Sequence, residues 1–264
     1  AVGEEKGAPH ESPTPAQDPP GVSRLTFSVR GGELVGVVGR VASGKSTLAA
    51  GVLGLLPAAE GGVQLRGRAA YVPQSPQILN ASVRENILFG ADFDSVRYQQ
   101  ALHACCLESD IAQFIDGDQT EIGEKGITIS GGQRARVAMA RAFYADADVI
   151  VLDDPLSAMD AHVGALVFRR CVLALRRRGK AVLFMTNQVH FCREADAILV
   201  LEAGRVAERG TYAELAARRG GQFAALLSAE VEGEAGRDGA AGGGHGARRT
   251  AAGDESDADQ EGAQ

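Results

Sequence analysis

The sequence lacks any uninterrupted apolar run of the roughly 18 to 20 residues that a membrane-spanning helix requires. Its longest uncharged and mainly apolar stretch, residues 46–59, is interrupted by two glycines and by Pro57. It also lacks an N-terminal basic segment followed by an apolar one, the pattern of a secretory signal. With 45% hydrophobic and 23% charged residues, the 264-residue chain has an ordinary globular composition. We expect a soluble, folded domain.

Cysteine is scarce, with four residues at positions 105, 106, 171 and 192. None forms a C-x-x-C pair, which argues against a disulfide framework. His103 could join Cys105 and Cys106 as metal ligands, but no second cluster completes a tetrahedral site. We expect small, buried or half-buried thiols on a helix, in a reducing intracellular compartment.

A basic excess is missing as well, since the net charge is -7. Residues 1–22 carry -3 and residues 228–264 carry -6, which leaves +2 for residues 23–227. A nearly neutral body disfavours nucleic-acid binding, because a surface that follows phosphates needs a basic stripe. Both ends are polar and poor in large apolar residues, so we expect disordered segments at 1–22 and 228–264 around one folded domain.

Within residues 23–227, short apolar runs alternate with helical patterns. Four runs of four or five residues lie at 34–38, 149–152, 181–185 and 198–201. Continuous apolar runs of this length indicate strands buried on both faces of a parallel sheet. Residues 133–144 repeat apolar positions with the spacing of an amphipathic helix. We therefore predict an α/β fold with a mixed or parallel sheet and a helical subdomain inserted near residues 90–140.

Residues 39–46 read G-R-V-A-S-G-K-S and match the pattern G-x-x-x-x-G-K-[ST]. Glycine lets successive backbone N–H groups approach phosphate oxygens closely. Lys45 would supply a mobile charge for the β- and γ-phosphates, and the Ser46 hydroxyl would bind Mg²⁺. An apolar strand precedes this loop, and an apolar helical pattern at 47–56 follows it and directs its positive dipole end at the anion. The segment predicts a nucleotide-phosphate loop.

Two other segments carry candidate site residues. The apolar run 149–152 ends in Asp153 and Asp154, and Asp153 stands where a P-loop ATPase places its Mg²⁺ carboxylate. Residues 130–133, Ser-Gly-Gly-Gln, open the predicted helix and could offer N–H groups and a hydroxyl to a second anion. An ordinary helix N-cap explains Ser130 equally well, so the spacing alone leaves both interpretations open.

Five ordered motifs together resemble an ATP-binding-cassette domain, a P-loop NTPase, over about residues 23–227. They are residues 39–46, Gln74, residues 129–133, residues 149–154 and residues 157–160. Residues 81–90, 120–126 and 153–163 resemble the first nucleotide-binding domain of multidrug-resistance-associated exporters. Residues 186–191 are similar to the form in plant and protist members.

The resemblance implies a role for each motif. The loop would hold ATP phosphates through Gly39, Arg40, Val41, Ala42, Ser43, Gly44, Lys45, Ser46 and Thr47. The magnesium ion would be bound by Ser46, Asp153 and Gln74, and Gln74 would also sense the membrane domain. ATP on a partner domain would be covered by Ser130, Gly131, Gly132 and Gln133. Asp160 would signal across that dimer, and residues 120–126 would touch the transmembrane coupling helices.

Three positions depart from the family's pattern. Asp154 replaces the glutamate that polarises the attacking water, and a displacement of about 1 Å at such a group can cost on the order of a hundredfold in rate. Asn187 replaces the switch histidine, and an amide cannot carry a proton at neutral pH. We interpret His190 as a surface or packing residue. The first aromatic residue, Phe27, falls in the strand just before the loop, so the residue that stacks on adenine is absent or precedes the chain.

The resemblance implies an ATP hydrolase with ATP and Mg²⁺ as cofactors, slow in isolation, that powers export across a membrane. Its partners would be transmembrane domains and a second nucleotide-binding domain in the same polypeptide, and it would lie at the cytoplasmic face. Organic anions and glutathione conjugates are the implied substrates. One alternative is a nucleotide-gated regulatory module, as in channel-associated cassettes. A soluble repair-type ATPase is disfavoured, because Lys45 and Asp153 are 108 residues apart with no heptad array between them.

Overall fold

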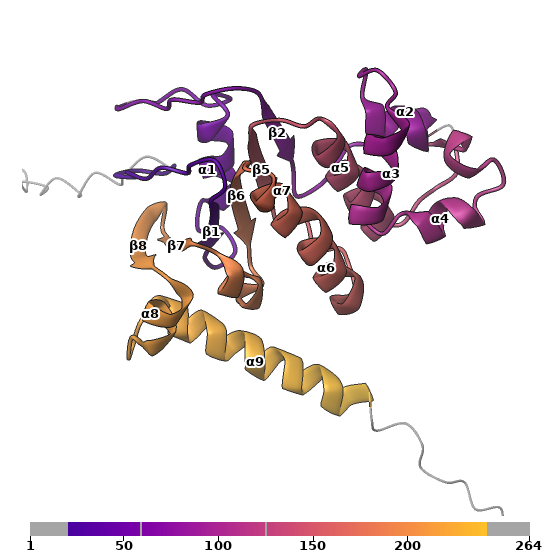
Figure 1. Cartoon of the computed structure of the whole chain (residues 1–264). Helices are drawn as coiled ribbons and strands as arrows, with labels where there is room; N and C mark the ends of the chain where they lie inside the picture. The colour runs from indigo at the N-terminus through magenta and orange to yellow at the C-terminus, as the bar shows by residue number, and fades with distance from the viewer. Residues whose placement is uncertain (1–20, 59, 125, 242–264) are drawn as a thin grey trace, which may run out of the picture.

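The computed structural model describes residues 21–58, 60–124 and 126–241. In this part, a six-stranded sheet has the order β2-β5-β6-β1-β7-β8, and helices lie on both of its sides (Figure 1). The strands are β1 (Leu34–Val38), β2 (Ala69–Val72), β5 (Val149–Asp153), β6 (Ala181–Thr186), β7 (Ala197–Glu202) and β8 (Arg205–Gly210). Neighbouring strands run parallel except for β7 and β8, which form an antiparallel hairpin. The predicted α/β class with a mixed sheet is confirmed.

The four predicted apolar runs all form strands, and side-chain alternation explains why they are apolar throughout. In β5, Ile150 and Leu152 belong to one hydrophobic cluster, whereas Val151 belongs to the cluster on the opposite face. Successive side chains of a strand point to opposite faces, so a sheet covered on both sides needs apolar residues at every position.

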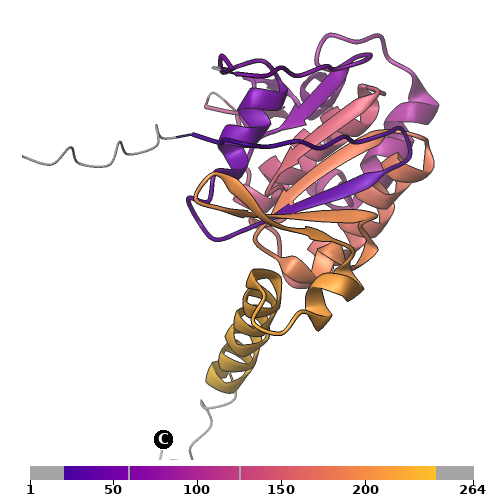
Figure 2. The ribbon, with the colours of Figure 1, turned by 90° about the vertical axis from the view of Figure 1, so that its left-hand side faces the viewer.

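Helices cover the two faces unequally. The helix α1 (Lys45–Val52) packs on one face, together with the segment 22–29. The other face is covered by α5 (Gly131–Tyr144) and by a helical stretch that runs through α6 (Ala161–Val167), the π-helical turn η2 (Phe168–Val172) and α7 (Leu173–Arg177). Figure 2 shows α1 on one side of the sheet and these longer helices on the other.

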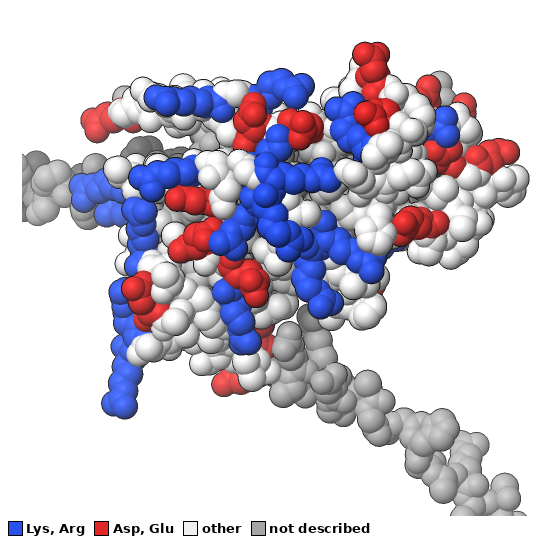
Figure 3. All heavy atoms as spheres, viewed as in Figure 1, with Lys and Arg blue, Asp and Glu red and all other residues white. Residues whose placement is uncertain are grey.

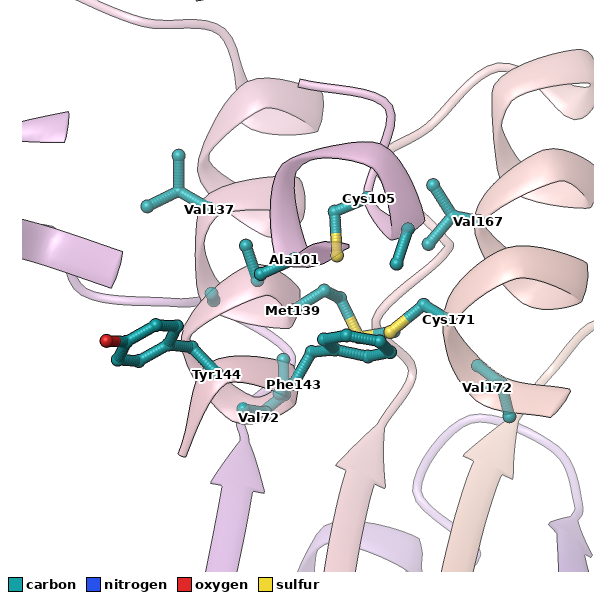
Figure 4. Packing of buried hydrophobic residues seen from close by; sticks show 14 of the residues in the cluster. Val72, Ala101, Cys105, Val137, Met139, Phe143, Tyr144, Val167, Cys171 and Val172 are labelled. Carbon is teal, nitrogen blue, oxygen red and sulfur yellow. The ribbon is translucent and has the colours of Figure 1, made fainter. Parts of the chain in front are cut away.

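A group of short elements lies between β2 and α5, as the predicted helical insertion requires. It contains α2 (Val83–Leu88), α3 (Ser95–Ala104), α4 (Glu108–Gln113), the 3₁₀ turn η1 (Gly117–Gln119) and a small sheet of β3 (Ala81–Ser82) and β4 (Glu121–Ile122). Figure 4 shows Cys105 beside α5 and η2, where Met139, Phe143 and Cys171 pack. Three cysteines are buried and Cys106 is half-buried, as predicted. Their expected position on a helix is wrong for Cys105 and Cys106, which follow the end of α3, whereas Cys171 lies in the π-helical turn η2 and Cys192 lies in a 3₁₀ segment.

The C-terminal part differs from the prediction. After the 3₁₀ segment η3 (Val189–Glu194) and the helix α8 (Tyr212–Ala217), the chain forms α9 (Gln222–Ala241). Residues 228–241, which the sequence analysis expected to form part of a disordered linker, are helical in the structure. Phe223, fully buried against α8 and η3, anchors the start of this helix. Residues 1–20 and 242–264, the rest of the predicted terminal segments, lie outside the described residues.

Two local predictions are also corrected. Phe27 does not lie in a strand: residues 25–30 belong to no helix or strand, and Leu25, Phe27 and Val29 pack on the α1 face of the sheet. The helix predicted at 47–56 begins at Lys45 and ends at Val52, because Gly54 adopts the left-handed conformation (φ 71°) and Pro57 follows. No helix in the described part of the chain combines the length and the apolar character needed to cross a membrane.

Candidate active site

The loop from Gly39 to Gly44 joins β1 to α1, and its backbone explains its glycines. Gly44 has φ 105° and Ala42 has φ 64°, so both adopt the left-handed conformation. At Gly39, a Cβ atom would stand 2.4 Å from the carbonyl oxygen of Leu201. The loop can therefore approach β7 closely only with glycine at position 39. This path leaves the first-turn N–H groups of α1 without acceptors inside the helix, as phosphate binding requires.

The ammonium group of Lys45 lies inside this loop. Its Nζ donates to the carbonyl oxygens of Gly39 at 2.7 Å and Arg40 at 3.0 Å. Burial lowers the pKa of Lys45, while the negative charges of Asp154 and Asp153 act in the opposite direction and raise it. The loop thus holds a cation beside two carboxylates, and exchange of two neutral carbonyl acceptors for phosphate oxygens would strengthen its interactions.

Asp153, the last residue of β5, is buried and accepts a long hydrogen bond of 3.5 Å from the Tyr71 hydroxyl. Burial raises the pKa of Tyr71, and the neighbouring Asp153 charge adds to this effect. This carboxylate is buried and weakly hydrogen-bonded, and the Ser46 hydroxyl lies in the first turn of α1. Carboxylate and hydroxyl groups are the kind of oxygen ligand that Mg²⁺ prefers. Gln74 is exposed two residues beyond β2, and the pairing of Val72 with Leu152 places it at the same edge of the sheet.

Asp154 is brought directly to Asn187. Its carboxylate accepts from Asn187 Nδ2 at 3.0 Å, from Asn187 N at 3.4 Å and from the Thr186 hydroxyl at 3.4 Å. Its own N–H donates to the carbonyl of Met185 at 2.9 Å. Asp154 is 3% exposed and has φ 49°, a strained value for a residue with a Cβ atom. Both carboxylate oxygens are therefore engaged by the end of β6.

Residues 130–133 form the N-terminus of α5 as a capping box. Ser130 Oγ accepts from Gln133 N at 3.1 Å, and Ser130 N donates to Gln133 Oε1 at 2.8 Å. The Gly132 position approaches the carbonyl of Ala158 so closely that a Cβ atom there would lie 3.0 Å from it. The N-cap interpretation of Ser130 is confirmed, and it leaves the binding of an anion by the same residues as a prediction.

Two further predicted residues lie near helix termini. Asp160 caps α6, where its carboxylate accepts from Val163 N at 2.9 Å, and this backbone hydrogen bond lowers the pKa of Asp160. His190 lies in η3 and contacts α9, with its Nδ1 2.7 Å from Glu230 Oε1. The His190 ring also packs against Phe191. The interpretation of His190 as a surface or packing residue is confirmed.

The face seen in Figure 3 carries a band of basic side chains with acidic residues among them. Ion pairs among the described residues include Arg176–Asp196 and Lys180–Asp146.

Sequence reasoning missed two residues that support these motifs. Asn86 is completely buried, accepts from Leu79 N at 2.8 Å, and bonds to Arg141 Nη2 at 3.2 Å. Asp110 bonds to Gln133 Nε2 at 2.8 Å and forms an ion pair with Arg136. Asp110 belongs to no spacing pattern, because its partners lie on α5. Asn86 lies within the segment 81–90, but its burial and its bond to Arg141 of α5 depend on the tertiary structure.

The family model described as "ABC transporter" matches residues 22–157. The chain is 46% identical over 211 residues to "ABC transporter C family member 12" of Dictyostelium discoideum, covering 80% of this chain and 16% of that protein. It is 45% identical over 217 residues to "ATP-binding cassette sub-family C member 4" of Mus musculus, covering 82% and 16% respectively. With "ABC transporter C family member 9" of Arabidopsis thaliana, it shares 44% identity over 218 residues, 83% of this chain and 14% of that protein. The chain thus spans about one sixth of the length of these relatives.

Proposed function

The chain belongs to the ABC transporter family as a nucleotide-binding domain of the C-family type, and from this we propose that it is the first of two such domains in an exporter. The transmembrane domains and the second nucleotide-binding domain would lie in the same polypeptide, outside this sequence. The small share of each relative that the chain covers supports this proposal. Its attachment to the membrane, at the cytoplasmic face, would be through those transmembrane domains.

The phosphate loop, Lys45, Ser46 and Asp153 bind Mg-ATP in this proposal. Lys45 turns from the carbonyls of Gly39 and Arg40 toward the β- and γ-phosphates, and the first-turn N–H groups of α1 donate to phosphate oxygens. Ser46 and Asp153 provide oxygen ligands for Mg²⁺, which neutralises phosphate charge when bound, and Gln74 approaches from the neighbouring strand.

The contact between Asp154 and Asn187 carries the proposal that hydrolysis is slow. A carboxylate whose two oxygens already accept hydrogen bonds from Asn187 and Thr186 has fewer lone pairs free to accept a hydrogen bond from the attacking water. The Asp154 side chain is also shorter than the usual glutamate by one methylene, and Asn187 cannot take up a proton. The site would therefore hold Mg-ATP for long periods.

Residues 130–133 would serve a different nucleotide, bound by the second domain. Ser130 is exposed at the start of α5, and the N–H groups of the first helical turn are oriented for an anion. Residues 130–133 of this domain would thus complete the more active site of the partner domain. Asp160 would signal between the two nucleotide-binding domains.

The transmembrane domains would contact the part of the helical insertion that contains β3 and β4. This small sheet brings residues 81–90 and 120–126 together. Phe89 and Leu79 are 57% and 48% exposed there. Large apolar side chains at the surface are typical of an interaction site. Organic anions would be the exported substrates, bound outside this chain.

A single-turnover experiment tests the proposed function. The purified chain is loaded with γ-labelled Mg-ATP, freed of excess nucleotide, and followed for label retention against phosphate release. Long retention of intact ATP is expected, and Lys45→Ala serves as the control that should retain none. Prompt phosphate release by the wild type would contradict the proposal that the site retains Mg-ATP for long periods, and would show that Asp154 suffices for catalysis.

A further inference from the structure

The side-chain amide of Gln133 bonds in two directions at once. Its Oε1 accepts from Ser130 N at 2.8 Å, while its Nε2 donates to Asp110 Oδ1 at 2.8 Å. An amide rotated by half a turn would set its NH₂ group against the Ser130 N–H and its oxygen against the carboxylate. Asp110 therefore determines which way the Gln133 amide faces.

Asp110 is itself firmly held. It lies in α4, and Arg136 Nη2 is 2.7 Å from each of its two carboxylate oxygens. Both side chains of this pair are 12% exposed, so the interaction is largely shielded from water. Gln133 and Arg136 are three residues apart on one face of α5, and the carboxylate thus joins the first two turns of that helix to α4.

The orientation of the Gln133 amide determines the hydrogen bonds of Ser130. Its Oγ already accepts from Gln133 N at 3.1 Å, so its hydroxyl proton remains free to be donated to an outside acceptor. On the basis of the function proposed above, we propose that Asp110 is a positioning residue: through Gln133 it holds Ser130 in the geometry that binds the nucleotide of the partner domain. Asp110 touches no nucleotide itself.

A purely structural role for the Asp110–Arg136 ion pair makes a different prediction, and two substitutions separate the roles. Asp110→Asn keeps an oxygen for Gln133 Nε2 but loses the charge that pairs with Arg136. Asp110→Ala loses both. If the ion pair alone matters, the two variants should behave alike. If Asp110 acts through Gln133, they should differ at residues 130–133 even though both are less stable.

Hydrogen–deuterium exchange on the whole chain measures this difference. We expect Asp110→Ala to speed exchange of the Ser130 and Gln133 amides by about tenfold or more, as loss of a hydrogen bond to a charged group implies. Asp110→Asn should change it by less than about threefold, although both variants melt at lower temperature. Glu108→Gln, which alters an exposed carboxylate of α4 paired with His103, is the matched control and should behave as wild type.

Equal acceleration by the two variants, or none in either, would overturn the positioning role. If Asp110→Ala does not fold, the pair Asp110→Leu with Arg136→Met removes the buried charges together and still removes the anchor of Gln133. That variant should also exchange rapidly at 130–133.

A nucleotide measurement separates this inference from the proposed function. Binding of a fluorescent ATP analogue reports the chain's own phosphate loop and should be the same in wild type and Asp110→Ala. ATP-dependent association of two chains reports residues 130–133 and should weaken about tenfold in the variant. Unchanged association would overturn the positioning role. A wild type that binds no ATP would contradict the proposed function, while the exchange data would still decide the role of Asp110.

Discussion

Replacing Asp154 by Glu together with Asn187 by His should convert a site that retains Mg-ATP into one that hydrolyses it. Glutamate extends the side chain at position 154 by one methylene, about 1.5 Å. Histidine at position 187 removes the amide that now donates to the Asp154 carboxylate at 3.0 Å. The carboxylate would then be free to reach an attacking water, and the imidazole could contact the γ-phosphate.

The expected gain follows from the geometry. A displacement of about 1 Å at a catalytic group changes a rate by on the order of a hundredfold, and we expect a gain of that size in single-turnover hydrolysis. Because residue 154 is 3% exposed, the added methylene also costs about 1 to 3 kcal/mol of folding stability. The melting temperature should therefore fall by several degrees while activity rises.

The assay is phosphate release from preloaded, γ-labelled Mg-ATP, with retention of label measured in parallel. Asp154→Glu alone leaves the Asn187 amide in place, and Asn187→His alone leaves the carboxylate short, so each should gain less than about tenfold. Lys45→Ala added to the double variant should abolish release and excludes a contaminating ATPase. A double variant that binds Mg-ATP normally but hydrolyses it at the wild-type rate would refute the reasoning. It would favour a regulatory module in which nucleotide occupancy is the output.

Three further predictions concern binding and stability. Mg-ATP at a hundred times its dissociation constant should stabilise the wild type by about 2.7 kcal/mol in a thermal melt; Lys45→Ala should show no shift, and an equal shift would contradict the role of the loop. Asn86→Ala should cost about 3 kcal/mol by chemical denaturation, because it leaves buried backbone groups without partners; a loss below about 1 kcal/mol would show that water replaces the amide. Burial alone would raise the pKa of Asp118, but the hydrogen bond from the Arg84 guanidinium holds it below the ordinary value of 3.8. The stability that this pair contributes is therefore fully present above pH 3.8 and is lost as the pH falls through the lowered pKa. Denaturant titrations at pH 7 and pH 3 should show a smaller acid loss in Asp118→Asn than in the wild type, and an equal loss would refute this linkage.

Much of the sheet and the phosphate loop could be predicted because their determinants are local. The run at 34–38 is apolar throughout since both faces of β1 are covered, and it forms a strand over the same residues. Helix α5 begins at Gly131 rather than at residue 133, because the capping box of Ser130 and Gln133 extends it into the glycines.

The misses share a different cause. Phe27 was expected in the strand before the phosphate loop, but it lies outside every strand and packs on the α1 face of the sheet with Leu25 and Val29, a tertiary contact that no local pattern indicates. The helix through residues 228–241 escaped notice because its composition is polar, while its anchors are Phe223 and the contact of Glu230 with His190. Asp110 carries no local pattern at all, since its partners are on α5.

The fold itself supports the proposal that the two nucleotide motifs serve different ATP molecules. The phosphate loop continues into α1, which packs on one face of the sheet with Val35 and Val37. Residues 130–133 open α5, which packs on the opposite face and rests against the loop after β5 through Gly132 and Ala158. A rigid sheet thus separates the helices that carry the two motifs, so closure of 130–133 over a nucleotide is achieved most simply with a second domain. Asp154 and Asn187 can weaken hydrolysis at this domain's own loop without altering 130–133, and slow turnover here is compatible with fast turnover in the partner.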